Sequence, residues 1–265
     1  MEKVSLVGGF IRWMLHLGVL FLLCFGVASH AETAAVASSP PVGSPPVMSS
    51  VDPYEPFNRV MFRFNDILDR VVLKPVARTY VKIIPSPIVT GVRNFFSNVD
   101  NLPTIPNDIL QGNFYQGVRD TWRLVINSTV GILGFFDPAS RIGLGPNVED
   151  FGLTLAQWGY RNSGYLVVPF LGPSTTRDLI GFPVDYYLFS IYPHIHPERT
   201  RYAIFGLGVV SRRAELLSYQ NVMQQASLDR YVFMRDAWMQ HRAWRIARNH
   251  ELGDPYLEKE STGKP

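Results

Sequence analysis

The sequence predicts a mainly α-helical body that follows an export signal and a tether. Apolar residues recur at helical spacing along most of the chain, and strand-like stretches are sparse. Charged residues make up 18% of the 265 residues, against about 25% in an average soluble domain. The body therefore has little charge to cover a water-exposed surface. Its net charge of +3 is too weak to indicate a nucleic-acid partner.

An export signal is predicted for residues 1–31. Lys3 and Arg12 provide a basic start, and residues 13–27 form an apolar run. Ala31 and the small residue two places before it stand at the positions that a signal peptidase reads. The sequence therefore predicts a signal that is cut after Ala31.

The one cysteine of the chain, Cys24, lies within that apolar run. A bacterial lipoprotein signal needs a small residue directly before the lipidated cysteine, and here Leu23 stands in that place. Lipidation of Cys24 is therefore disfavoured. An atypical lipid anchor and an uncut membrane anchor stay open as alternatives, and all three possibilities place the body outside the cytoplasm.

The composition divides the rest of the chain into three parts. Residues 32–51 are rich in Ala, Ser, Val, Pro and Gly, cannot bury a core and are predicted to be an extended tether. Residues 52–250 form the predicted helical domain, and residues 251–265 a polar C-terminal tail.

The first predicted helix of this domain is strongly amphipathic. Its apolar residues follow the i, i+3, i+4, i+7 pattern, and polar residues occupy the other side. The apolar face consists of Phe57, Val60, Met61, Phe64, Ile67, Leu68 and Val71, and the polar face of Asn58, Arg59, Arg63, Asn65, Asp66, Asp69 and Arg70. Pro75 predicts the start of a second helix that extends towards Ile84.

Capping residues and periodicity predict the remaining elements. Ser86 and Pro87 begin a third helix, whose apolar face extends to Val99, and Asn113 caps a fourth helix that carries Trp122. Further helices are predicted from Asp150 to Trp158, Arg199 to Tyr219 and Ser227 to Asn249, and one strand from Tyr165 to Val168.

No apolar run after residue 31 reaches the roughly 18 residues that a spanning helix needs. Instead, four short runs are broken by, or lie beside, Gly or Pro: residues 130–136, 165–171, 186–192 and 202–210. Such pieces can pack in an ordinary α-helical core or lie along one side of a bilayer, and the runs alone leave both interpretations open.

Several ordered motifs resemble those of the MlaA family, also called VacJ, over about residues 52–245. The resemblance begins with DPYEPFNRVMFRFN at residues 52–65 and continues in the family's order. The later motifs are KPVA (74–77), VRNFFSN (92–98), LQG (110–112), RLVINSTVG (123–131), DFGLTL (150–155), VPFLGPSTTRD (168–178) and RAELL (213–217).

The resemblance implies an outer-membrane protein of Gram-negative bacteria that keeps phospholipid out of the outer leaflet. It implies a ring-like bundle of amphipathic helices in the periplasmic leaflet, with an amphipathic central channel. Its expected partners are phospholipids, a trimeric outer-membrane porin and a periplasmic phospholipid carrier of the Mla pathway. No cofactor or covalent chemistry is implied. Family members are typically lipoproteins, and Leu23 departs from that pattern.

Residues in the amphipathic segments are the candidates for lipid contact. The apolar candidates, predicted to face lipid or a neighbouring helix, are Phe57, Val60, Met61, Phe64, Phe95, Phe96 and Trp122. Asn58, Arg63 and Asn65 are candidates for the polar side of the lipid path. Packing in an ordinary helix–helix core is the alternative for each apolar residue.

The last predicted helix interleaves basic and aromatic residues. Its five arginines outweigh Asp229 and Asp236, which leaves a net charge of +3. We expect Arg242 and Arg245 to dock the carrier or the membrane surface, because anionic headgroups and protein partners suit such a helix. A solvated face on a packed helix is the alternative.

Three rival functions are weaker. His194 and His196 could bind a metal ion if their segment were extended, but the flanking prolines favour a plain loop, so no metal site is predicted. A lipase could combine Ser128 or Ser174 with a histidine, but the sequence has no nucleophile-elbow motif. A non-enzymatic scaffold associated with porins remains as the second hypothesis.

Overall fold

The computed structural model describes residues 52–218 and 229–252, all of which belong to one unit of the chain, Val47–Pro265. The predicted signal, tether and C-terminal tail lie outside the described residues, as does Cys24. The elements in chain order are α2 (Glu55–Leu68), η2 (Asp69–Leu73), α3 (Lys74–Ile83), α4 (Ser86–Leu110), α5 (Phe114–Thr129), α6 (Pro138–Arg141), α7 (Phe151–Gln157), β1 (Tyr165–Val168), β2 (Gly172–Thr175), α8 (Thr176–Val184), η3 (Asp185–Phe189), η4 (Tyr192–His194), α9 (Glu198–Glu215) and α11 (Arg230–Leu252). The mainly α prediction is confirmed.

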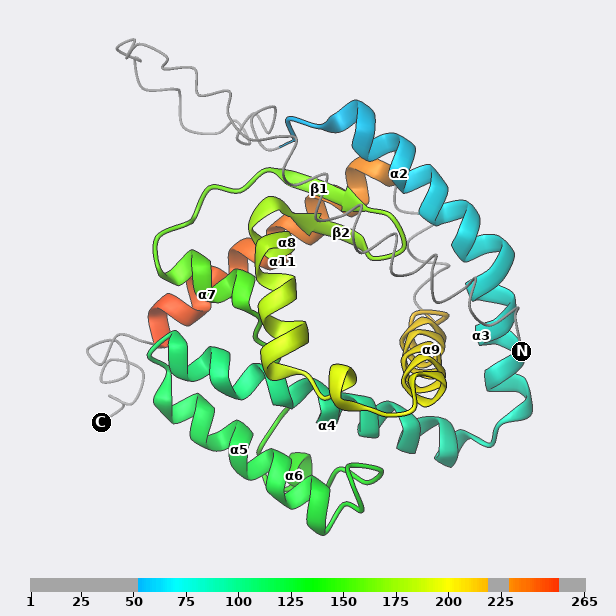
Figure 1. Cartoon of the computed structure of the whole chain (residues 1–265), viewed down its shortest axis with the longest axis vertical. Helices are drawn as coiled ribbons and strands as arrows, with labels where there is room; N and C mark the ends of the chain where they lie inside the picture. Colours follow the sequence, from blue (N-terminus) through cyan, green and yellow to red (C-terminus); the bar gives the residue numbers. More distant parts are fainter. Residues whose placement is uncertain (1–51, 219–228, 253–265) are drawn as a thin grey trace, which may run out of the picture. The chain divides into compact units, whose positions relative to one another are not determined.

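These elements contact one another in a closed circuit (Figure 1). The segment η2 joins α2 to α3, α3 packs on α9, and α9 packs on α4. From α4 the contacts lead to α7, then to α11 and β2, and β2 pairs with β1, which returns to α2. Within the described residues, no helix is both long and apolar enough to cross a membrane.

The start of the body is one helical stretch in place of two separate helices. Pro75 stands in the first turn of α3, as predicted, but the π-helical segment η2 connects α2 to α3 without a turn. The π-helical turn is wider than an α-helical turn and joins the two α-helices without a break in the helical backbone. The helical stretch ends only at Ile84, where the backbone becomes extended.

The third helix is longer than its apolar face suggests. It continues beyond Val99 to Leu110 and includes both Pro103 and Pro106. An interior proline costs a helix about 3 kcal/mol, so packing must supply the compensation. The helix contacts α5, α7 and α9, and this tertiary contact outweighs the local signal.

The predicted strand is confirmed at its predicted bounds, and its partner was missed. Tyr165–Val168 is β1, and it pairs antiparallel with β2, so that Tyr165 lies opposite Thr175. The sequence of β2, Gly-Pro-Ser-Thr, has little β propensity. It forms a strand because its backbone pairs with one edge of β1.

Two asparagines of α2 occupy the other edge of β1. Asn58 donates to the carbonyl of Tyr165 at 3.0 Å and accepts from the amide of Val167 at 2.8 Å. Two helical turns later, Asn65 donates to Val168 at 3.0 Å and accepts from Phe170 at 2.8 Å. Each side-chain amide thus makes the pair of bonds that a neighbouring strand would make, which satisfies an edge that would otherwise be open.

A small aromatic core lies beneath this junction. Tyr165, Val167 and Tyr231 are buried together, and Met61 and Phe62 of α2 pack against them. The Tyr231 hydroxyl donates to Asp52, whose other oxygen accepts from Asn58 at 2.7 Å. The first described residue, α2, β1 and α11 therefore meet at one point.

Replacing Asn58 with alanine is expected to destabilise the protein by about 2–4 kcal/mol, because it leaves buried backbone groups of β1 without partners. The melting temperature should fall by roughly 5–15 °C. Thermal unfolding of the full chain in detergent measures this. Asn162→Ala changes an exposed asparagine and serves as the control. Equal melting temperatures for the two variants would contradict the edge-satisfying role of Asn58.

Candidate functional site

The helix α5 turns its apolar face outward and its polar face inward. Val118 and Trp122 are 57% and 58% exposed, whereas Asp120 and Arg123 on the other side are 1% and 2% exposed. Phe114, Tyr115, Val125 and Val130 extend the exposed face. This is the reverse of the usual arrangement in a water-soluble protein, where the apolar stripe of a helix faces the core.

The same reversal applies to α2. Phe57, Val60 and Phe64 are exposed, as are Ile67 and Val71 further along the same stripe. Across the described residues, the buried side chains include many Asn, Asp, Thr and Arg, while many large apolar side chains are exposed. A contiguous exposed apolar surface marks a site of interaction with a membrane or another protein.

The predicted lipid-contact residues are therefore divided between the surface and the interior. Trp122 is exposed like the three α2 residues above, and Met61 and Phe95 are half-buried. Phe96 is buried on α9, where a Cβ added to Gly208 would lie 3.0 Å from its ring. Gly208 is thus a close-packing position.

The predicted polar candidates are divided in the same way. Arg63 is exposed. Asn58 is fully buried and Asn65 half-buried, and both are occupied by the backbone bonds to β1 described above. In place of a polar wall for lipid, these two asparagines form an internal junction.

Arg242 and Arg245 also lie in the interior, in place of the exposed docking face that the sequence predicts. Arg242 donates to Asp150 at 3.0 Å and also to Asp178. Arg245 donates to the buried carboxylate of Glu149 at 3.1 Å. The basic face of α11 is oriented inward because Glu149 and Asp150, directly before α7, and Asp178 of α8 attract it.

The positive charge of Arg242 lowers the pKa of its partner Asp150. Burial alone would raise the pKa of Asp150, but its bonds to Arg242 outweigh burial and hold that pKa below the usual range. Asp150 also caps α7 by accepting from the amide of Leu153 at 2.9 Å. The ion pair therefore fixes the start of α7 as well as the position of α11.

A second buried cluster joins α4, α5 and α11. Asp108 and Asp120 face each other, and Asn147 donates to both, at 3.4 Å and 3.1 Å. Burial, followed by the neighbouring carboxylates Asp120 and Glu149, raises the pKa of Asp108 well above the usual carboxyl range. Asp108 is therefore protonated near neutral pH and can donate to Asp120.

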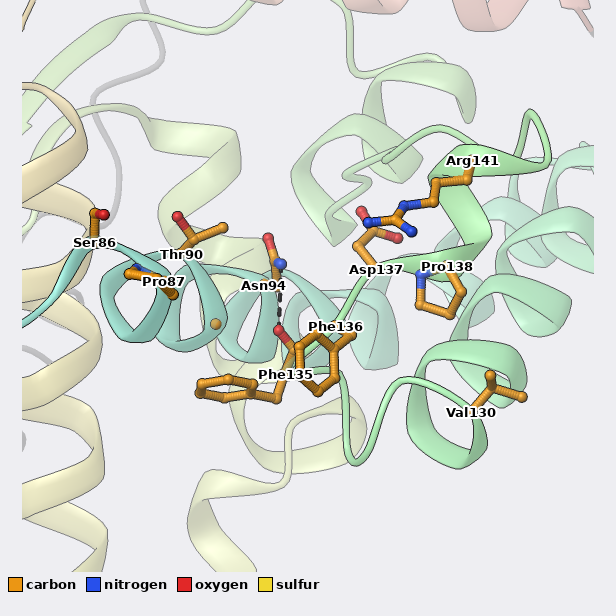
Figure 2. A pocket seen from close by; sticks show the side chains of 11 residues that line it. Ser86, Pro87, Thr90, Asn94, Val130, Phe135, Phe136, Asp137, Pro138 and Arg141 are labelled. Atoms are coloured by element: carbon orange, nitrogen blue, oxygen red, sulfur yellow. Dashed lines mark hydrogen bonds between the residues drawn. The ribbon is translucent and has the colours of Figure 1, made fainter.

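A cavity of about 520 Å³ lies where α4 faces the end of α5 and the start of α6. Figure 2 shows Ser86, Pro87 and Thr90 at one end, Phe135 and Phe136 along one side, and Asp137, Pro138 and Arg141 at the other end. Asn94 donates to the carbonyl of Phe135 at 3.3 Å. The lining is mostly apolar with charge at one end, which suits an amphipathic ligand.

The geometry gives little support to the lipase and metal-site hypotheses. Ser128 accepts from Asn98, and Ser174 donates to the backbone of Thr175. His194 and His196 are exposed. Among the residues that the structure describes, no group of three or more His, Cys, Asp and Glu side chains is placed to hold a metal ion.

Comparison with known proteins identifies the family. A family model described as MlaA lipoprotein matches residues 50–245. The chain belongs to the MlaA family. A relative from Escherichia coli (strain K12), named intermembrane phospholipid transport system lipoprotein MlaA, is 32% identical over 209 residues, which cover 76% of this chain and 80% of the relative.

Other comparisons agree with this assignment. An uncharacterised protein of Rickettsia typhi is 33% identical over 214 residues, or 81% of this chain and 82% of that protein. A solved structure described as "Structural basis for maintenance of bacterial outer membrane lipid asymmetry" aligns with a TM-score of 0.65 at 29% identity, and covers 74% of this chain and 98% of that chain. The fold of the chain is therefore the MlaA fold.

The structure explains one of the MlaA-family motifs, the DFG of residues 150–152. Asp150 caps α7 and binds Arg242, as described above. Gly152 leaves room for the partners, because an added Cβ would lie 2.2 Å from a carboxylate oxygen of Asp178 and 3.0 Å from Arg242. Glu149 and Asp178 were missed as partners, although Arg242, Arg245 and Arg248, each three residues apart, are a usable signal of a shared face.

Replacing Asp108 with asparagine is expected to stabilise this MlaA-family protein at neutral and alkaline pH. A raised folded-state pKa gives stability that is fully present below the unfolded pKa, near 3.9, and is lost as pH rises. Asparagine keeps the donor that protonated Asp108 supplies and needs no proton. The gain should be on the order of 1 kcal/mol, or about 2–4 °C in melting temperature.

Thermal unfolding from pH 5 to pH 9 measures this effect, and the gain from Asp108→Asn should grow with pH. Glu198→Gln, at an exposed carboxylate of α9, is the matched control and should show little change. A gain that is constant across this range, or equal to that of the control, would contradict a protonated Asp108.

Proposed function

We propose that this protein takes mislocalised phospholipid from the outer leaflet of the Gram-negative outer membrane and passes it to a periplasmic lipid carrier for return to the inner membrane. The outward apolar faces of helices whose inward faces are polar carry this proposal. On α5, for example, Val118 and Trp122 are exposed while Asp120 and Arg123 are buried. Helices with this arrangement suit a bilayer interface.

The names of the relatives support the same function. The Escherichia coli relative is named for intermembrane phospholipid transport, and the solved structure concerns outer-membrane lipid asymmetry. A carrier for phospholipid must accept an apolar and a polar part of one molecule, and the mostly apolar cavity with Asp137 and Arg141 at one end is of that kind.

We further propose that the exported body lies in the periplasmic leaflet, beside a trimeric porin. The exposed stripes of α2 and α5 are where lipid or a membrane partner would bind, because both are contiguous and apolar. The proposed transfer is by binding and release, without covalent chemistry. On this proposal the apolar faces can hold the body at the membrane even if Cys24 carries no lipid.

Charge placed on the outward face of α5 should weaken membrane binding. We expect the double variant Val118→Glu with Trp122→Glu to reduce vesicle binding by about tenfold or more, because two exposed apolar side chains become acidic. Flotation with vesicles of phosphatidylethanolamine and phosphatidylglycerol measures this. A Cys24→Ser background removes any acyl anchor.

The matched control is Ala243→Glu with Ala247→Glu, which adds the same two charges at exposed positions of α11. This control should bind vesicles like the parent protein. If both double variants bind equally well, the α5 face is not the membrane face.

The transport function itself predicts a loss of lipid asymmetry when the gene is deleted. Surface-exposed phospholipid and detergent sensitivity should both rise in the deletion strain, because misplaced lipid is no longer removed. Complementation with the parent gene should restore both. Altered cell shape or porin levels with normal asymmetry would instead support a porin-associated scaffold and overturn the proposal.

A further inference from the structure

A second cavity lies beside the first along α4. It has a volume of about 380 Å³, and both cavities are lined by Asn94 and Asp137. Each volume falls within the roughly 300–1,000 Å³ that protein ligand sites occupy. Because they share two wall residues, the cavities are neighbours.

The two cavities differ in chemistry. The exposed wall of the first is mostly apolar, with Phe135 and Phe136 along one side, and its charged residues, Asp137 and Arg141, lie at one end. The second carries six charged residues: Arg93, Asp100, Arg123, Asp137, Arg212 and Glu215. One cavity is therefore suited to a hydrocarbon chain and the other to a polar group with charges of both signs.

Four of those six charges neutralise one another. Arg123 donates to Asp137 at 2.9 Å, and Arg212 donates to both oxygens of Asp100, at 2.6 Å and 2.8 Å. Burial would raise the pKa of Asp137, but its bonds from Ser140 and Arg123 lower it to about 2, so this pair stays charged. Neither pair offers net charge to a ligand.

The remaining two charges are Arg93 and Glu215. Both side chains are exposed, and within residues 52–218 and 229–252 neither makes a side-chain hydrogen bond or an ion pair. The second cavity thus presents one available cation and one available anion. A ligand group that carries a phosphate and an amine matches this pair in sign and number, and charge-assisted bonds would hold both ends.

A strained loop lies beside the first cavity, and Val130, Phe135 and Phe136 at its ends line that cavity. Ile132 and Leu133 have φ angles of 53° and 56°, a conformation that is costly for residues with a Cβ and rare for a β-branched one. Hydrogen bonds to α5 hold the loop, with the Leu133 amide 3.0 Å from the carbonyl of Ser128. Such strain persists only where the surroundings impose it.

This loop is apolar on both sides. Ile132 and Leu133 are 64% and 68% exposed, so the tip presents two large apolar side chains to the surroundings. Phe135 turns the other way onto α4, where a Cβ added to Gly91 would lie 2.2 Å from its ring. An exposed apolar tip and a mostly apolar cavity thus lie on the same short loop, an arrangement that suits an acyl chain.

We propose that the two cavities together form a binding site for one zwitterionic, amine-bearing phospholipid. An acyl chain lies in the first cavity beside Phe135 and Phe136, the phosphate binds Arg93, and the amine binds Glu215. The inference rests on the proposed function, since it names a lipid and a site for it. A phosphoglycerol headgroup would leave Glu215 without a partner and is expected to bind less well.

The test uses the purified full chain in detergent and measures the phospholipid that it takes up from vesicles, by mass spectrometry. We expect Arg93→Gln to lower bound phosphatidylethanolamine by about tenfold, the effect of one lost charge-assisted bond. Thr90→Phe, which fills the first cavity from an exposed position of α4, should have a similar effect. Glu215→Gln should lower phosphatidylethanolamine but not phosphatidylglycerol binding.

Arg78→Gln, at an exposed arginine of α3 outside both cavities, is the matched control and should bind lipid like the parent. Unfolding temperatures confirm that each variant folds. Free glycerophosphoethanolamine should compete poorly, because it lacks the acyl chain; equal competition would show that the site takes the headgroup alone and would overturn the lipid assignment.

A phosphatidylethanolamine with a photoreactive acyl chain locates the site directly. Adducts within residues 86–94 and 130–141 support the proposal, and adducts confined to other residues overturn it, as does parental lipid binding by Arg93→Gln and Thr90→Phe. These results are independent of the gene deletion. Normal asymmetry in the deletion strain refutes the transport function, whereas lost asymmetry with unaffected variants refutes only this site.

Discussion

Three arginines on α11 close the circuit of elements on which the fold depends. Arg242 binds the carboxylates of Asp150 and Asp178, and Arg245 binds Glu149. Arg248 adds a bond to Asn147 at 2.9 Å. A buried charge without a partner costs several kcal/mol. The buried Arg242 and the half-buried Arg245 and Arg248 therefore require the acidic residues around α7. That requirement places α11, the last described helix, against α7 from the middle of the sequence.

This polar interior makes the apolar exterior possible. Buried polar groups are tolerated only when they are hydrogen-bonded, and the junctions of α4, α5, α7 and α11 satisfy them with one another. The apolar stripes of α2 and α5 are then not needed for the core. Among the described residues, a small aromatic cluster around Tyr165 and Tyr231 is the part that resembles an ordinary core. Part of the small number of charged residues is buried in ion pairs. The surface therefore carries few charges and extensive apolar area.

The sequence predicted the helices well but not their orientation. Periodicity identifies two faces of α2 and does not say which one is buried, so Asn58 was assigned to a lipid path although it is internal. The spacing of Asn58 and Asn65, two helical turns, could have indicated a shared partner. The strand β2 and the helical turns across Pro103 and Pro106 depend on contacts from distant parts of the chain, which local propensity does not contain.

The exposed apolar face of α5 and the first cavity share one support. On the inner face of α5, Arg123 and Asn127 both bind Asp137, and Asn127 also accepts from the amide of Ala139 at 3.1 Å. These bonds fix the start of α6 and, with it, the end of the strained loop. A lipid chain that moves from the outer face of α5 to the cavity would therefore pass over a rigid edge, and the polar core would stay closed while it moved. Binding and release could then occur at the surface of the fold, without disturbing the buried ion pairs that hold the circuit together.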